Sequence, residues 1–171
     1  MKLAISYFYQ IRNFKRNMVP VSTAMYDPDW YHANLGERHI FKDKRGIING
    51  IRLLPFQPGF ECEGLCGGTD MCTESGPAAC KFLKAYRNQL EHLDLDEILK
   101  ELEDLANSIQ QQEKFEEEPI IVFIVYEAPD NPCSERWVLL DFFKDKGIEC
   151  KELEYPIYPI LEEIKKESFD F

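Results

Sequence analysis

The run Ile120–Tyr126 (IIVFIVY) limits the fold of this chain more than any other segment. It is continuous, apolar and rich in β-branched side chains, which favour extended backbone. It falls far short of the roughly 20 residues that a membrane-spanning helix needs. An apolar strand without alternating polar residues is typical of a parallel sheet that is covered on both faces. The run therefore predicts a central, buried strand.

Patterns for strands and helices alternate around this run. Short apolar, aromatic or β-branched stretches predict further strands at Lys2–Phe8, Met18–Met25, Ile47–Leu54 and Ile148–Leu153. Apolar residues at helical spacing predict one helix from Pro77, a second from the capping box of Asp94 and Glu97, and a third over Ser134–Lys146. We expect an α/β fold with a mainly parallel sheet flanked by helices.

The length of 171 residues suits one sizeable core. We expect a single α/β domain over residues 1–155, an irregular glycine- and cysteine-rich loop over 60–80, and a peripheral C-terminal tail over 156–171. No signal peptide or membrane-spanning segment is apparent, which predicts a cytoplasmic protein without a membrane partner. Its six cysteines are then expected to be reduced thiols, metal ligands or catalytic groups rather than disulfides.

The net charge of −11 is unevenly distributed. Residues 1–60 contain nine Lys/Arg and four Asp/Glu, whereas residues 61–171 contain eleven and twenty-seven. The acidic part repels a polyanion, so we do not expect non-specific nucleic-acid binding. The basic part leaves two interpretations open: a simply solvated surface, or a surface that faces a small anion or a nucleotide.

The junction between the central strand and the following helix is the first candidate site. Glu127 ends the strand, and Cys133, Ser134 and Arg136 stand at the predicted helix start, where helix N–H groups favour anions and thiolates. In this hypothesis Cys133 is the nucleophile, Glu127 orients the ligand or acts as base, Arg136 holds an anion, and Ser134 and Arg12 contact the ligand. In the alternative, Ser134 only caps the helix, Cys133 is a small buried hydrophobe, and Glu127 and Arg136 form a structural ion pair.

This junction resembles the uncharacterised family catalogued as domain of unknown function 488. The resemblance rests on Glu127, which is followed after five residues by Cys133, and on the segments 5–14 (ISYFYQIRNF) and 28–31 (PDWY). The resemblance implies an α/β fold and no agreed activity. Members of that family commonly have Cys-His-Arg, whereas here Ser134 and Glu135 separate Cys133 from Arg136. The missing histidine argues against a Cys–His catalytic pair.

Four cysteines form the second candidate site: Cys62, Cys66, Cys72 and Cys80. Four thiolates suit tetrahedral zinc, and neighbouring glycines allow the chain to wrap an ion. An iron–sulfur cluster is the alternative cofactor. Free thiols or a redox pair also fit the unusual spacing. If only three cysteines bind, His92, His39 or a water could complete the shell.

Two functions follow from these sites. The first is a cysteine-dependent enzyme with a pocket for an anion or a nucleotide-like ligand near Cys133, in a protein that also binds a metal. The alternative is a non-catalytic binding protein with a structural zinc, whose acidic helices dock a partner. We expect His32 and His39 to be incidental, and the pair Trp30–Tyr31 to fill the core.

Overall fold

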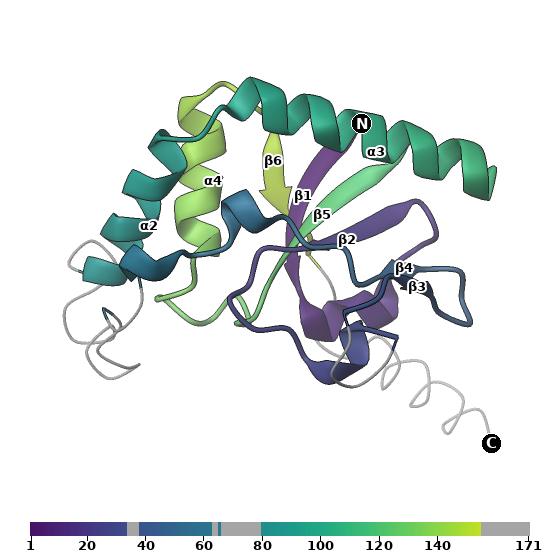
Figure 1. Ribbon diagram of the computed structural model, residues 1–171, viewed down its shortest axis with the longest axis horizontal. Helices are drawn as coiled ribbons and strands as arrows, with labels where there is room; N and C mark the ends of the chain where they lie inside the picture. Colours follow the sequence, from purple (N-terminus) through teal and green to yellow (C-terminus); the bar gives the residue numbers. More distant parts are fainter. Residues whose placement is uncertain (34–37, 63–64, 66–79, 155–171) are drawn as a thin grey trace, which may run out of the picture.

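The structure, a computed structural model, describes residues 1–33, 38–62, 65 and 80–154. Its centre is a four-stranded parallel sheet with the order β2-β5-β1-β6 (Figure 1). The strands are β1 (Lys2–Tyr7), β2 (Met18–Ser22), β5 (Ile120–Val125) and β6 (Cys150–Glu152). The predicted α/β fold with a mainly parallel sheet is confirmed, and the apolar run forms the strand β5 inside the sheet.

One face of the sheet carries the larger core. It is covered by α2 (Lys81–Glu91), α3 (Leu95–Glu113) and α4 (Arg136–Asp145), together with the short 3-10 helices η3 (Leu54–Phe56) and η4 (Phe60–Cys62). Phe123 of β5 contacts Phe56 and Phe143, with ring centroids 5.4 Å apart in both pairs. This aromatic packing fixes α4 against the centre of the sheet.

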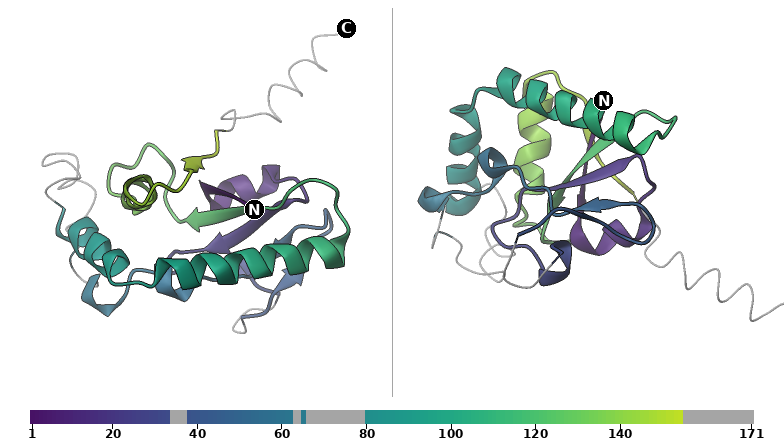
Figure 2. Two further views of the ribbon diagram at one scale, coloured as in Figure 1. Left: turned by 90° about the horizontal axis from the view of Figure 1, so that it is seen from above. Right: turned by 45° about the vertical axis from the view of Figure 1, so that its right-hand side comes forward.

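The opposite face carries a smaller core. It is covered by η1 (Phe8–Asn13) and η2 (Asp29–Tyr31), with Ile47 at its margin. A two-stranded antiparallel ribbon of β3 (Phe41–Lys42) and β4 (Ile48–Asn49) lies beside β2. Seen from above, η1 and α3 lie on opposite sides of the sheet (Figure 2). Tyr31 is fully buried there, and its hydroxyl donates hydrogen bonds to the carbonyls of Pro20 and Ile51. The prediction that Trp30 and Tyr31 fill the core is confirmed for Tyr31 and wrong for Trp30, which is exposed.

The first and last of the crossovers between the parallel strands leave the sheet on opposite faces. The connection from β1 to β2 contains η1 on the smaller core and passes β5, whereas the connection from β5 to β6 contains α4 on the larger core and passes β1. Neighbouring parallel strands whose connections depart in opposite directions form a topological switch point. In this chain that point lies between β1 and β5, where Tyr7 pairs with Val125.

Several element bounds differ from those predicted. Only Ile48–Asn49 of the run 47–54 is a strand, and it pairs with β3 outside the main sheet. The helix α3 begins after Asp94, whose carboxylate accepts the predicted hydrogen bond from the Glu97 N–H at 3.2 Å. Pro77 and the tail 156–171 lie outside the described residues. In the described part of the chain, no helix has the length and apolarity to cross a membrane.

Candidate functional site

The candidate site lies at the carboxyl ends of β1 and β5. In open parallel sheets, ligands bind outside the carboxyl ends of strands at a switch point. Glu127 follows β5 here, and α4 brings Ser134, Glu135 and Arg136 to the same end of the sheet. The structure therefore brings together three residues of the predicted junction: Glu127, Ser134 and Arg136.

Arg136 is completely buried and its guanidinium is already occupied. Its Nε and Nη2 donate to the two carboxylate oxygens of Glu152 on β6, at 3.0 and 3.1 Å, and its Nη1 donates to the backbone carbonyl of Glu127 at 2.6 Å. The ring of Tyr7 lies 5.6 Å from the guanidinium carbon. Arg136 thus joins β1, β5, β6 and α4, and the expected ion pair with the Glu127 carboxylate is replaced by a pair with Glu152.

This pairing changes the role expected of Arg136. The carboxyl of Glu135 interacts electrostatically with both Glu127 and Arg136, so this end of the sheet carries two acidic groups in addition to Glu152. One guanidinium that is held in a two-pronged pair cannot neutralise an added anion as well. Arg136 is therefore a positioning residue, which aligns the end of β5 with α4, rather than the anion holder predicted from the sequence.

Ser134 links the strand end to the helix start. Its hydroxyl donates to Oε2 of Glu127 at 3.3 Å and accepts from the backbone N–H of Arg136 at 3.3 Å. Ser134 is fully buried, whereas Glu127 is half-buried. The hydroxyl satisfies one N–H at the helix start and orients the Glu127 carboxylate, whereas contact of Ser134 with a ligand stays a prediction.

Glu135 is the residue of this site that sequence reasoning missed. It is 4% exposed, and no side chain among the described residues donates a hydrogen bond to its carboxylate. Burial, and then the charge of Glu127, raise the pKa of Glu135 to about 8. A buried carboxyl that exchanges its proton close to neutral pH is a general acid–base candidate. The available signal was the departure from Cys-His-Arg, which puts Glu135 after Ser134.

Cys133 lies outside α4, which begins three residues later at Arg136. Its backbone N–H donates to Oδ1 of Asn131 at 2.9 Å. The predicted position of Cys133 at the helix start is therefore wrong, because α4 begins at Arg136 rather than at Ser134 and the turn around Asn131 precedes it. Cys133 is disulfide-bonded, against the expectation of reduced thiols only, so it offers a thiolate only after reduction.

Arg12 is exposed and stacks on an aromatic ring. Its guanidinium carbon lies 3.6 Å from the centroid of Tyr9, and its Nε donates to the Tyr9 carbonyl at 2.9 Å. Within the described part of the chain no carboxylate pairs with this guanidinium. The Tyr9 ring in turn stacks on Tyr7 at 6.4 Å. Arg12 is thus held in one orientation with its terminal nitrogens available to an anion.

The predicted metal site falls partly outside the described residues, which do not include Cys66 and Cys72. Cys62 in η4 and Cys80, the residue before α2, are free thiols that pack on the same core. Burial raises the pKa of the Cys62 thiol, which lies 3.7 Å from Oε1 of Gln89. The described residues contain no group of three or more His, Cys, Asp or Glu placed to hold a metal. Zinc binding stays a prediction.

A second polar cluster stands at the end of β2. The Asp27 carboxylate accepts from the Ser22 hydroxyl at 2.5 Å and lies 3.0 Å from Nε2 of His32 and 2.9 Å from Nε of Arg52. Nδ1 of His32 is buried without a partner. His32 is therefore part of a buried network, and the expectation that it is incidental is wrong. The signal is weak in the sequence, because all three partners belong to loops or strand ends.

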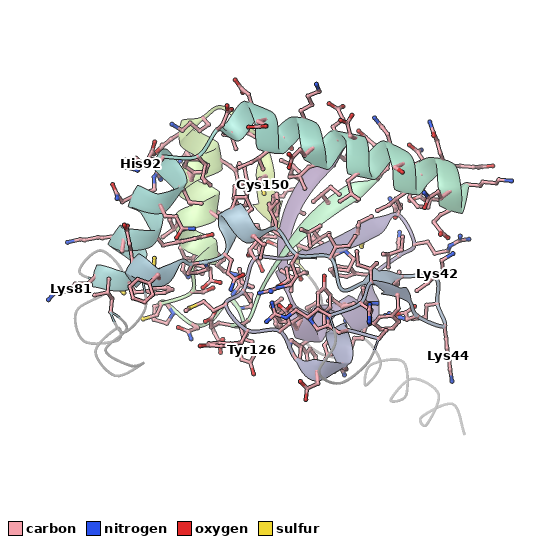
Figure 3. All side chains as sticks on the ribbon, viewed as in Figure 1. Lys42, Lys44, Lys81, His92, Tyr126 and Cys150 are labelled. Carbon is pink, nitrogen blue, oxygen red and sulfur yellow. The ribbon has the colours of Figure 1, made fainter. Side chains whose placement is uncertain are left out.

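Two cavities lie away from this end of the sheet. One of about 650 Å³ is lined by the start of β1 and by α3, and one of about 740 Å³ by the turn between α2 and α3. Figure 3 shows Tyr126 at the carboxyl end of the sheet, far from His92 in that turn. Neither cavity includes Cys133, Ser134 or Arg136.

Comparison with known proteins gives no match: no family model, no curated protein and no solved structure is similar to the chain. The resemblance to the family catalogued as domain of unknown function 488 therefore stays a prediction, and function is argued from the site alone.

Proposed function

We propose that this chain is a cysteine-dependent enzyme that acts on a small anionic, nucleotide-like ligand at the carboxyl ends of β1 and β5. The observation that carries the proposal is Glu135, a buried carboxyl beside a second carboxylate at a topological switch point. Burial holds the pKa of Glu135 above its ordinary value, which suits this carboxyl to the role of acid in an acid–base pair. Glu127, exposed enough to meet a ligand, is the base, and Glu135 is the acid.

The remaining residues take roles that their contacts support. Reduction of the disulfide by a dithiol would release the Cys133 thiol, whose thiolate attacks an electrophilic centre of the ligand and forms a covalent bond. The leaving group takes the proton of Glu135, and attack by water, deprotonated by Glu127, then frees the thiolate. Ser134 and Arg136 hold the two carboxyls in place through the contacts described above. Arg12 supplies the positive charge for the anion.

The pH dependence of Cys133 alkylation tests this proposal. The reduced protein is treated with iodoacetamide over a range of pH, and modification of Cys133 is followed by peptide mass spectrometry. A carboxylate nearby disfavours a thiolate, so Glu135→Gln should move the alkylation profile of Cys133 to lower pH. Glu103→Gln, on the exposed face of α3, is the control and should leave the profile unchanged. Identical profiles for the wild type and Glu135→Gln would show that Glu135 and Cys133 do not act together.

A second candidate function is a non-catalytic binding protein with a structural zinc. It is favoured by Cys62 and Cys80, two free thiols on elements that pack together, and by the exposed carboxylates of α3. Cys133→Ser separates the two functions. An enzyme loses turnover in this variant, whereas a docking protein keeps its partner.

A further inference from the structure

Exposed aromatic side chains gather at the carboxyl ends of β1 and β5. Trp30 is 52% exposed and Tyr126 is 61% exposed, yet both rings contact buried Phe8 edge-to-face, at centroid distances of 6.1 and 6.2 Å. Tyr9, 45% exposed, follows Phe8 in η1 and carries Arg12 on its ring. We call Tyr9, Arg12, Trp30 and Tyr126 the aromatic–arginine surface.

Exposure of these rings needs a physical reason. Burying one large apolar side chain stabilises a fold by about 1.5–3 kcal/mol, so a group of exposed rings gives up a stabilisation that the core could have used. Clustered exposed apolar side chains mark binding surfaces more often than scattered ones do. Contact with Phe8 already orders the rings of Trp30 and Tyr126. A ligand that binds these rings therefore loses less affinity to side-chain ordering.

The charge of the surface selects the ligand. Among the described residues no carboxylate pairs with the guanidinium of Arg12, which stacks on Tyr9, the residue after Phe8. A ligand that covers the rings and satisfies the guanidinium has a flat aromatic part and an anionic part. The strongly acidic remainder of the chain opposes a long polyanion, which leaves a small molecule rather than a strand.

We propose that the aromatic–arginine surface binds a mononucleotide, with its base stacked on Tyr126 and its phosphate bound by Arg12. The inference rests on the proposed function, because it gives the substrate class of that same site. Its position agrees with the proposed chemistry: Tyr126 directly precedes Glu127, and Figure 3 shows Tyr126 beyond the carboxyl end of the sheet. Tyr126 contacts Phe8 of η1 on one face of the sheet, whereas the Glu127 carboxylate contacts Ser134, beside α4 on the other. The nucleotide base on Tyr126 and the carboxylate of Glu127 would then approach the switch point from opposite faces of the sheet.

The test uses adenosine monophosphate as the probe and the fluorescence of Trp30 as the readout. Trp30 and Trp137 are the two tryptophans of the chain, so Trp137→Phe leaves Trp30 as the sole indole. We expect saturable quenching by adenosine monophosphate, weaker binding of adenosine, and weaker binding of ribose 5-phosphate. Stacking on one ring predicts that Tyr126→Ala weakens the affinity between about fivefold and about a hundredfold, and Tyr126→Phe preserves it.

Matched variants keep the test specific. Tyr26→Ala removes an exposed ring, 74% exposed, that makes no ring contact within the described part of the chain, and it should bind like the wild type. Arg12→Ala should abolish the advantage of adenosine monophosphate over adenosine. Retained binding in Tyr126→Phe shows that a loss in Tyr126→Ala comes from the missing ring rather than from misfolding.

Three results would overturn the inference. They are equal affinity for ribose 5-phosphate and adenosine monophosphate, unchanged affinity in both Tyr126→Ala and Arg12→Ala, and much tighter, steeply salt-dependent binding of a single-stranded hexanucleotide. The failure of the proposed reaction looks different. If the protein binds the nucleotide but Glu135→Gln does not change the pH profile of Cys133 alkylation, the binding site stands and the proposed enzyme mechanism is wrong.

Discussion

Arg136 and Glu152 are joined by two hydrogen bonds, of 3.0 and 3.1 Å, although the guanidinium is fully buried. The pair connects α4 to the edge strand β6, and the third hydrogen bond of Arg136 reaches the carbonyl of Glu127 at the end of β5. Burial also raises the pKa of Glu152, an effect that the Arg136 charge only partly opposes. The geometry of the carboxyl edge therefore depends on one buried side chain.

The first prediction follows from this dependence. Arg136→Met leaves the Glu152 carboxylate and the Glu127 carbonyl without their donor, and should lower the free energy of unfolding by about 3–5 kcal/mol. Arg87→Met is the matched control, because Arg87 forms surface pairs with Glu91 and Asp145 that contribute under about 1 kcal/mol. Urea unfolding measures both. The double variant Arg136→Met with Glu152→Leu should regain much of the loss; equal losses for Arg136→Met and Arg87→Met would contradict the role given to Arg136.

The sequence predicted the sheet better than it predicted the site. Ile120–Val125 was recognisable because a strand buried on both faces contains no polar residue. Ile47–Leu54 is also rich in Ile and Leu, yet Gly50, with a φ of 96°, and the close approach of the His39 carbonyl end the strand after Asn49. Local composition shows that a segment is buried, but it does not show where a strand ends or which strand it pairs with, because pairing depends on the tertiary fold.

The contacts of the candidate site were hidden for the same reason. Arg136 meets Glu152 only because β6 lies beside β1, which residue spacing does not reveal. Glu135 looks like an ordinary solvated residue at a helix start, and its burial comes from its position between the end of β5 and α2. The residue types of the junction were predictable, whereas their partners and proton affinities required the fold.

The second prediction concerns Glu135 and pH. Its pKa of about 8 in the folded protein exceeds the ordinary value of 4.5, so between these values the folded state holds a proton that the unfolded state has lost. Stability from this group therefore falls as the pH rises through that window. Glu135→Gln, which stays neutral, should melt at a higher temperature than the wild type near about pH 9 and should lose this advantage near about pH 5.

Exposed Glu103→Gln is the control for this measurement and should show the same pH dependence as the wild type. Thermal unfolding followed by circular dichroism at both pH values is sufficient. A Glu135→Gln variant whose melting temperature differs from the wild type by a constant amount at all pH values would show that the carboxyl titrates normally.

The third prediction compares three cysteines. Burial, and then Glu152, raise the pKa of the Cys150 thiol to about 12, and burial raises the pKa of Cys62, whereas Cys133 is half-buried beside a turn. After reduction with a dithiol, iodoacetamide near neutral pH should modify Cys133 at least about tenfold faster than Cys150 or Cys62. Without reduction Cys133 should stay unmodified, because it is disulfide-bonded. Equal, slow modification of all three after reduction would favour a purely structural role for Cys133.

Structural zinc contributes about 10–16 kcal/mol of apparent binding free energy in small peptides near neutral pH. The sheet and its helices bury their own core in this chain, so we expect chelation to lower the melting temperature without unfolding the α/β domain. Because the ligands bind as thiolates, zinc uptake should release protons and weaken at low pH.

Metal analysis of protein purified in a reducing buffer without chelator measures this prediction. Cys62→Ser and Cys80→Ser should each lose the metal, whereas Cys150→Ser, which changes a thiol of β6, should keep it. A brown protein with visible absorbance would indicate an iron–sulfur cluster, rather than zinc, at the same cysteines. A colourless protein with under about a tenth of an equivalent of any transition metal would leave the four cysteines without a metal and would remove the structural-zinc alternative as well.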